Sequence, residues 1–480
     1  MEVFRKIFTT IYLNILKVLI AILLIASLVH IIDLNKDAVI VGIVLLSFTG
    51  IEVYILRRNI KNKFKLLLIL LCGFAISGLW LLNINSIPTS DFMTMYNCAQ
   101  KFLNGDTSSF WGTSYIARFP HLTIMILYMA FMIKVFPINN ILVMKLVNLA
   151  LGTLTIYLIY LIVKEIFNST KKALYAAALT TIFPPLVTYT GVFCTENIAI
   201  PLYLISTYIF LLVIKGKKNA YYLILSGIAL SLGNLFRMVA AIMIIAYGMY
   251  IIIYPKDKLL HKIRNILLYA IPYILILFLV SSTLQALKIT EFPLWKGSEP
   301  KITNILKGTN MESYGRWNEE DAAIVDKYNF DYEKIEEASK EIIKERLTTT
   351  PPLKLITFYI VKFALQWNEG DFGGNYWSKL YVPDEEIILD STLGVFQIIY
   401  VVVLTLALLG IYNKQGKNHH EEINLFYIIF CGYGLMYLIT ESQGRYSYII
   451  SWVFIILAME GISLLLNKIN KDKKLENLNK

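Results

Sequence analysis

Two acidic residues, Asp91 and Glu196, stand beside long apolar stretches of the chain. A carboxylate at the edge of a membrane can act as a general base toward a hydroxyl group or help to bind a divalent cation. Each residue also has a simpler interpretation: Ser90 or Asp91 can cap a helix, and Glu196 can be a solvated interfacial acid. Because charges near membrane depth are costly, we treat both acids as candidate catalytic residues.

Cationic side chains occur at similar positions, namely Arg118, His121, Arg237 and Arg445. An arginine keeps its charge and binds phosphate through two parallel hydrogen bonds, which suits an anionic, lipid-linked substrate. The simpler alternative is that each arginine extends toward lipid headgroups. His121, which follows Pro120, could position a phosphate or an acid, or cap the helix after it. Acids and arginines on one face would together form one site.

The composition indicates an all-α polytopic membrane protein. Of the 480 residues, 57% are hydrophobic and 16% are charged, whereas soluble proteins average about 25% charged residues. Apolar runs of nearly 20 residues recur, and we count about twelve transmembrane helices with both termini in the cytoplasm. The net charge of +11 is concentrated in short loops. We attribute it to membrane orientation and expect no nucleic-acid partner.

The orientation depends on one short apolar run. Residues 57–65 contain five basic and no acidic residues, so this loop is predicted to be cytoplasmic and Asp91 external. The run 121–136 is about 16 residues long, short for a span. If it crossed the membrane, the later basic loops would lie outside. We therefore expect a helix that folds back on the external side.

The chain is predicted to have three parts. Residues 1–283 would form a transmembrane catalytic core whose external loop, 84–139, begins with a surface helix over 92–103. Residues 284–390, with 13 basic and 19 acidic residues, would form a mostly helical external segment, with a charged helix at 331–346 and an interfacial helix at 353–367. Residues 391–480 would hold the last transmembrane helices and a basic cytoplasmic tail.

The order of these motifs resembles a known family. Asp91 and Tyr96 stand in the first large external loop, and the run Arg118-Phe119-Pro120-His121 follows. Glu196 and Arg237 come next, and Gln443-Gly444-Arg445-Tyr446 closes the series. The chain resembles the glycosyltransferases of the C superfamily, close to the protein O-mannosyltransferase and aminoarabinose transferase type. It departs from the family's paired acidic motif because Phe92 follows Asp91.

The resemblance implies an inverting transfer of a sugar from a polyprenyl-phosphate donor in the membrane lipid. The acceptor would be a glycan, lipid or protein of the cell envelope, on the external face. Asp91 would be the base, and Arg237 or Arg445 would hold the donor phosphate, while Glu196 would be a second acid or metal partner. Further substrate-binding residues would be Tyr96, Arg118, His121 and Tyr446. A divalent metal, Mg²⁺ or Mn²⁺, would take Asp91 and Glu196 as ligands.

Two other classes of function share these features. A polytopic lipid or polysaccharide transporter or flippase would also have many spans, but transporters favour internal repeats and broken helices near the midplane. We see no repeat, and the candidate residues lie at span ends. An acyltransferase or phosphotransferase acting on lipid intermediates would use a similar set of acids and cations, so this alternative stays open.

Overall fold

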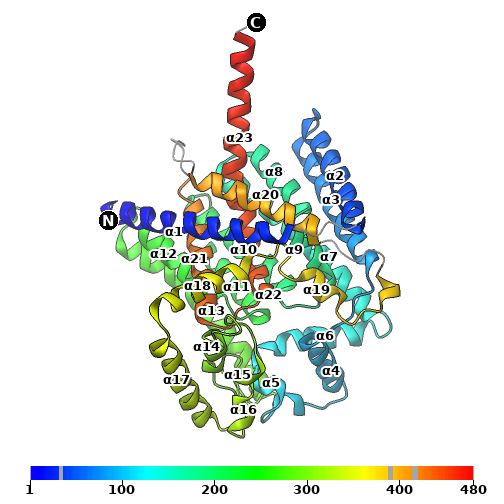
Figure 1. Ribbon diagram of the computed structural model, residues 1–480, viewed down its shortest axis with the longest axis vertical. Helices are drawn as coiled ribbons and strands as arrows, with labels where there is room; N and C mark the ends of the chain where they lie inside the picture. Colours follow the sequence, from blue (N-terminus) through cyan, green and yellow to red (C-terminus); the bar gives the residue numbers. More distant parts are fainter. Residues whose placement is uncertain (1, 32–35, 388–392, 413–419, 479–480) are drawn as a thin grey trace.

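The computed structural model describes residues 2–31, 36–387, 393–412 and 420–478, and within these ranges the chain is helical, without strands (Figure 1). The first half holds α1 (Glu2–Leu28), α2 (Lys36–Arg57), α3 (Asn62–Asn83), α4 (Asp91–Leu103), α5 (Tyr115–Arg118), α6 (Thr123–Val135), α7 (Asn140–Phe167), α8 (Thr170–Thr181), α9 (Pro184–Thr188), α10 (Glu196–Ile214) and α11 (Tyr222–Phe236). The second half holds α12 (Ala241–Ile253), α13 (Leu259–Ala286), α14 (Ile302–Gly308), α15 (Glu319–Ala322), α16 (Ile324–Lys327), α17 (Tyr332–Thr349), α18 (Pro352–Trp367), α19 (Gly374–Lys379), α20 (Leu393–Tyr412), α21 (Ile423–Ile439), α22 (Gly444–Ser447) and α23 (Trp452–Leu478). Short 3₁₀ turns are η1 (Val29–Ile31), η2 (Ser108–Phe110), η3 (Pro120–Leu122), η4 (Tyr189–Gly191), η5 (Asp384–Glu386) and η6 (Tyr448–Ile450).

The chain is a multi-pass membrane protein with fewer full-length spans than predicted. Seven described helices are long and apolar enough to cross a membrane, or up to nine if two bent helix pairs each count as one span. The predicted count of about twelve is therefore too high on this measure. The apolar stretch at 173–189, for example, is divided into α8 and α9 just before Pro184 and Pro185, which cannot continue the preceding helix. The helices α11, α12 and α21 have only 13 to 17 residues.

The short helix that the orientation depends on is α6. It has 13 residues and is about 20 Å long, whereas the hydrocarbon core of a bilayer is about 30 Å thick. The segments Ser108–Arg118 and Pro120–Val135 meet at an angle of 110°. This is the geometry of a broken span or a re-entrant pair, and α6 packs against the surface helix α4 and against α7. The length expected for this helix is confirmed.

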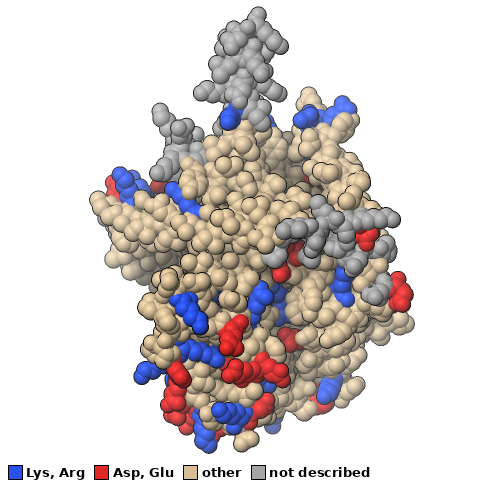
Figure 2. Space-filling view, in the orientation of Figure 1, with Lys and Arg blue, Asp and Glu red and all other residues tan. Residues whose placement is uncertain are grey.

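The charged and apolar parts of the chain are separated in space. In Figure 1 the α2–α3 turn and the end of α23 lie at one end of the molecule, and α14–α17 lie at the other. Figure 2 shows a mostly uncharged middle and a gathering of acidic and basic side chains over α14–α17. Most side chains of the predicted basic tail after residue 466 lie outside the described residues.

Residues 284–390, the predicted external segment, have a small core of their own. The predicted charged helix is confirmed as α17, and the Asp331 side chain caps it by accepting from the backbone N–H of Lys334 at 3.2 Å. Apolar side chains of α14, α16 and α17 pack together beneath it. Arg346 of α17 pairs with the buried Asp321 at 2.7 Å. These contacts make α14–α17 a defined body beside the transmembrane helices.

Lys362 fastens this body to the core. The helix expected at 353–367 is confirmed as α18, but Lys362 is fully buried rather than interfacial. Its ammonium group donates to the carbonyl oxygens of Gly308 at 2.6 Å, Leu438 at 2.8 Å and Thr440 at 2.8 Å. These carbonyls belong to the C-terminal ends of α14 and α21, where a positive charge is favourable. Lys362 thus fixes the start of the stretch that leads to Arg445.

Replacing Lys362 by methionine tests this role. The Lys362→Met substitution leaves three buried carbonyl groups without their donor, which costs about 3 kcal/mol or more. We expect the midpoint of thermal unfolding of the purified, detergent-solubilised protein to fall by several degrees. Lys354→Met, on an exposed position of the same helix, should leave the midpoint unchanged. Equal midpoints for the two variants would contradict the role given to Lys362.

Candidate active site

A cavity of about 670 Å³ lies where the ends of several helices meet beside the external segment. Its wall includes seven of the eight residues singled out from the sequence: Asp91, Arg118, His121, Glu196, Arg237, Arg445 and Tyr446. They come from parts of the chain up to 355 residues apart. The structure therefore brings the predicted set together, and only Tyr96 is missing from the wall.

Helix ends place the charges of this cavity. Asp91 is the first residue of α4 and Glu196 the first residue of α10, so both carboxylates stand at positive helix ends. Arg237 directly follows the last residue of α11, where the helix dipole favours a positive charge. Each charged residue type thus matches the helix end on which the sequence puts it.

Asp91 is the accessible acid of the cavity. Its side chain is 41% exposed, and its Oδ2 lies 3.6 Å from a guanidinium nitrogen of Arg445. The capping alternative fails for Ser90, which makes no side-chain bond to the helix. Ser90 has a φ of 49° and a ψ of −125°, a combination that non-glycine residues rarely adopt. Such backbone strain is frequent at functional sites, and here it directly precedes the acid.

Glu196 has a different environment. Its side chain is only 2% exposed, and its Oε1 lies 3.3 Å from Nε of Arg237. The Thr195 hydroxyl donates to its other oxygen at 3.0 Å. On the far side of the pair, the Tyr203 hydroxyl donates to the Arg237 carbonyl at 2.5 Å. Glu196 is therefore placed to orient Arg237 rather than to meet a substrate hydroxyl.

Arg445 is held between aromatic rings. Its guanidinium carbon lies 4.8 Å from the ring centre of Trp377, 5.1 Å from that of Phe92 and 5.6 Å from that of Tyr446. Such cation–π contacts fix the plane of the guanidinium group. Arg237 approaches the same Tyr446 ring at 5.0 Å. One terminal nitrogen of Arg445 is buried and makes no hydrogen bond, so the guanidinium group keeps a hydrogen-bond donor that the described residues do not use.

Arg118 and His121 line the cavity but do not supply free positive charge. Arg118 donates to Glu299 at 2.8 Å through Nε, and its NH2 lies 2.6 Å from the same carboxylate. Burial and the nearby positive charges of Arg237 and Lys301 lower the pKa of His121 to about 4. The imidazole is therefore neutral at physiological pH and offers a hydrogen bond, not a charge, to a substrate.

Tyr96 does not face the cavity. Its hydroxyl donates to the side chain of Asn140 at 2.9 Å, at the start of α7. Five residues separate it from Asp91, which is a rotation of about 140° around the helix axis. Tyr96 therefore lies outside the cavity wall, and its substrate-binding role stays a prediction.

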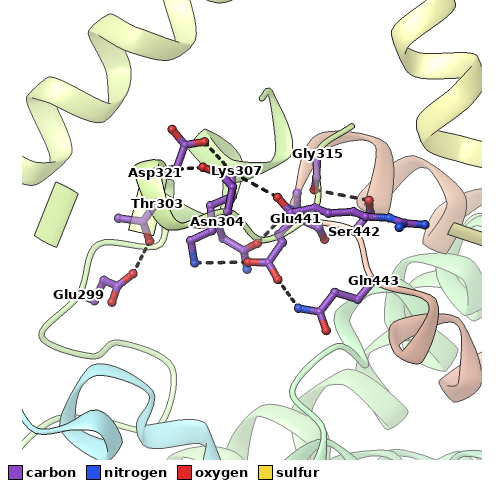
Figure 3. A network of polar contacts seen from close by, with 12 residues as sticks. Glu299, Thr303, Asn304, Lys307, Gly315, Asp321, Glu441, Ser442 and Gln443 are labelled. Carbon is purple, nitrogen blue, oxygen red and sulfur yellow. Dashed lines mark hydrogen bonds and ion pairs between the residues drawn. The ribbon is translucent and has the colours of Figure 1, made fainter. Parts of the chain in front are cut away.

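The sequence interpretation missed the acids and lysines that complete the wall. Figure 3 shows Glu299, Thr303, Asn304, Lys307, Glu441 and Gln443 in one polar network. Lys307 lies 3.3 Å from Glu441, and the Gln443 side chain donates to Glu441 at 2.6 Å. Glu441 could have been found from its position in the motif that ends at Tyr446, but Glu299 is one of many acids in the external segment.

The cavity does not fit the expected Mg²⁺ or Mn²⁺ ion. A divalent cation in a protein is held by several acidic or neutral oxygen ligands. Asp91 and Glu196 each face an arginine instead, and a metal ion there would meet a second positive charge. In the described part of the chain, no group of three or more His, Cys, Asp and Glu side chains could hold a metal.

The comparison with protein families confirms the predicted resemblance. Residues 122–284, roughly a third of the chain, match the family described as dolichyl-phosphate-mannose-protein mannosyltransferase. The matched segment is thus similar to membrane glycosyltransferases of the GT-C kind, which use a polyprenyl-phosphate sugar. The description of this family names mannosyltransferases, which agrees with the predicted enzyme class, a hexosyltransferase. The matched segment includes Glu196 and Arg237.

Among solved structures, the chain is similar to the oligosaccharyltransferase of Archaeoglobus fulgidus. One structure, with Zn and sulfate, is 13% identical with a TM-score of 0.42, covering 84% of this chain and 49% of that one. Another, tethered to an acceptor peptide with an NVT sequon, is 15% identical with a TM-score of 0.44, covering 87% and 51%. This chain spans about half the length of those chains. No curated protein matches it.

The acid–arginine pairs predict how transfer responds to metal removal. Because arginines occupy the positions where a metal would bind the two acids, we expect sugar transfer in purified form to be insensitive to EDTA. The measurement is turnover of a polyprenyl-phosphate sugar in nanodiscs before and after chelation, with Mg²⁺ and Mn²⁺ added back. Loss of turnover that either metal restores would contradict this expectation.

Proposed function

We propose that this protein moves a hexose, mannose, from polyprenyl phosphate to a hydroxyl group of a cell-envelope acceptor, with inversion at the anomeric carbon. The observation that carries the proposal is the pairing of a partly exposed acid, Asp91, with a buried arginine, Arg445, one of whose terminal nitrogens has no hydrogen-bond partner. A base for the acceptor and a donor for the phosphate thus stand side by side. The family match supports the donor class.

In this proposal the acceptor hydroxyl loses its proton to the carboxylate of Asp91. The acceptor oxygen forms a bond to the anomeric carbon from the face opposite the phosphate. The bond between that carbon and the phosphate oxygen breaks, and its electron pair leaves with the phosphate. A carboxylate base and a displacement from the opposite face give the inverted configuration.

The leaving phosphate gains negative charge during this step, and positive groups near it lower the barrier. Arg445 and Arg237 are the candidates, since both face the ring of Tyr446 and both line the cavity. Glu196 is a positioning residue that holds Arg237 in place. Two fixed guanidinium groups supply the charge that a divalent ion supplies to phosphates in other enzymes.

We further propose that the cavity faces the external side and that both termini are cytoplasmic. The strongly basic α2–α3 turn and the acidic segment over α14–α17 lie at opposite ends of the molecule (Figure 1), which supports this orientation. The division into a catalytic core at 1–283, an external segment at 284–390 and C-terminal helices at 391–480 belongs to the same proposal. The external segment forms the outer wall of the cavity.

Replacing the proposed base tests the mechanism. Asp91→Asn keeps the shape of the side chain but cannot take the proton, so we expect the turnover number to fall by about 10² to 10⁴. Binding of polyprenyl phosphate should persist, because the arginines remain. The control is Asp326→Asn, on an exposed position of α16. If Asp91→Asn turns over as fast as this control, Asp91 is not the base.

Cysteine labelling tests the orientation. Glu196 and Arg445 are too buried to be labelled, but Lys327 and Lys61 are exposed. In intact cells a membrane-impermeant maleimide should modify Lys327→Cys and should modify Lys61→Cys only after the membrane is opened. The wild-type protein with its four native cysteines gives the background. The reverse labelling pattern would overturn the proposed orientation.

A further inference from the structure

The charges of the cavity do not cancel. Its four acids each have one cationic partner: Asp91 with Arg445, Glu196 with Arg237, Glu299 with Arg118, and Glu441 with Lys307. Two further lysines of the wall, Lys296 and Lys301, form no ion pair with any described residue. They leave the cavity with a surplus of two positive charges. Both stand on the loop between α13 and α14.

This loop, between α13 and α14, is fixed rather than free. The backbone N–H of Ser298 donates to the carbonyl of Ala117 at 3.0 Å. A side chain on Gly297 would lie 2.0 Å from the carbonyl oxygen of Arg118, so the two loops touch backbone to backbone. The pair of Glu299 and Arg118 closes the contact at 2.6 Å. The two lysines are therefore held at a defined place on the outer wall.

Two tryptophans belong to the same outer wall. Trp295 directly precedes Lys296 and is 36% exposed, and Trp317 is 56% exposed. Large aromatic rings in the wall of a cavity offer a flat apolar face, against which the apolar face of a sugar ring can stack. The exposed Asn304 lies in the same wall and adds an amide that can bind hydroxyl groups.

Several backbone N–H groups beside this wall already donate hydrogen bonds within the protein. The backbone N–H of Glu441 donates to the Asn304 carbonyl at 2.8 Å, and that of Ser442 donates to the Gly315 carbonyl at 2.8 Å (Figure 3). Together with the bond between Ser298 and Ala117, these contacts occupy donors along which an extended peptide could align. Recognition at the wall therefore depends on side chains.

We propose that the outer wall is an acceptor subsite for an anionic glycan, a saccharide that carries phosphate or carboxylate groups. Its sugar rings stack on Trp295 and Trp317, and its anionic groups pair with Lys296 and Lys301. One of its hydroxyl groups then reaches Asp91. This inference rests on the proposed function, because it names the acceptor class for the same reaction.

Equilibrium binding in nanodiscs tests the subsite, with labelled probes of similar length: a glycerol-phosphate-bearing oligosaccharide, its neutral counterpart, and an acidic peptide containing serine and threonine. We expect the anionic oligosaccharide to bind at least about tenfold more tightly than the other two at low salt. The double variant Lys296→Gln and Lys301→Gln should remove that preference. The Trp317→Ala variant should bind both saccharides more weakly. The matched control is Lys344→Gln, on an exposed position of α17.

Binding of polyprenyl phosphate is measured in the same samples. It distinguishes a failure of the glycan subsite from a failure of the proposed function. The lysine and tryptophan variants should bind it as the wild type does, whereas Arg445→Gln should lose it. Equal binding of the anionic and neutral saccharides, or tightest binding of the acidic peptide, would overturn the glycan subsite alone. Failure of the wild type to bind polyprenyl phosphate would instead overturn the proposed function.

Discussion

The cavity depends on the pairing of charges that water cannot reach. A carboxylate or guanidinium group taken out of water costs several kcal/mol unless an opposite charge stands beside it. Glu196, Glu299 and Glu441 are almost fully buried, and each has a cation within 3.3 Å. The partners come from distant parts of the chain. The pairs therefore join the first external loop, the helix ends and the external segment into one site.

Within this pattern, exposure separates the roles of the two candidate catalytic acids. Asp91 is 41% exposed and has an arginine at 3.6 Å, whereas Glu196 is 2% exposed, with one oxygen in an ion pair with Arg237 and the other accepting from Thr195. A base needs access to a hydroxyl group, and a positioning residue needs fixed partners. Aromatic rings hold Arg445 in place, while one of its terminal nitrogens has no hydrogen-bond partner. The difference in exposure between Asp91 and Glu196 is thus the basis for assigning them different roles.

Much of the site could be predicted because its residues stand at the ends of apolar segments. Ends on one side of a membrane protein converge, so Asp91, Glu196, Arg237 and Arg445 could be grouped from sequence. Their partners could not be predicted, since the contact of Glu299 with Arg118 joins residues 181 positions apart. Predicting the face of α4 on which Tyr96 lies requires knowing where the helix begins and how it is rotated.

The fold, too, could be predicted only in part from the sequence. Hydropathy identifies apolar segments but not the proline break between α8 and α9 or the bend beside α6, so it overestimated the spans. The helices α4, α17 and α18 followed from apolar spacing and from caps such as Asp331. The burial of Lys362 could not be foreseen, because its three carbonyl partners lie on other helices.

The central claim is that the phosphate and the acceptor hydroxyl meet between Arg445 and Asp91. The most direct measurement is an experimental structure of the Asp91→Asn variant with an intact polyprenyl-phosphate sugar bound. The account predicts a phosphate oxygen at hydrogen-bonding distance from Arg445, with the anomeric carbon turned toward position 91. A phosphate bound at Lys301 or Lys307 instead, with residue 91 remote from the sugar, would contradict it.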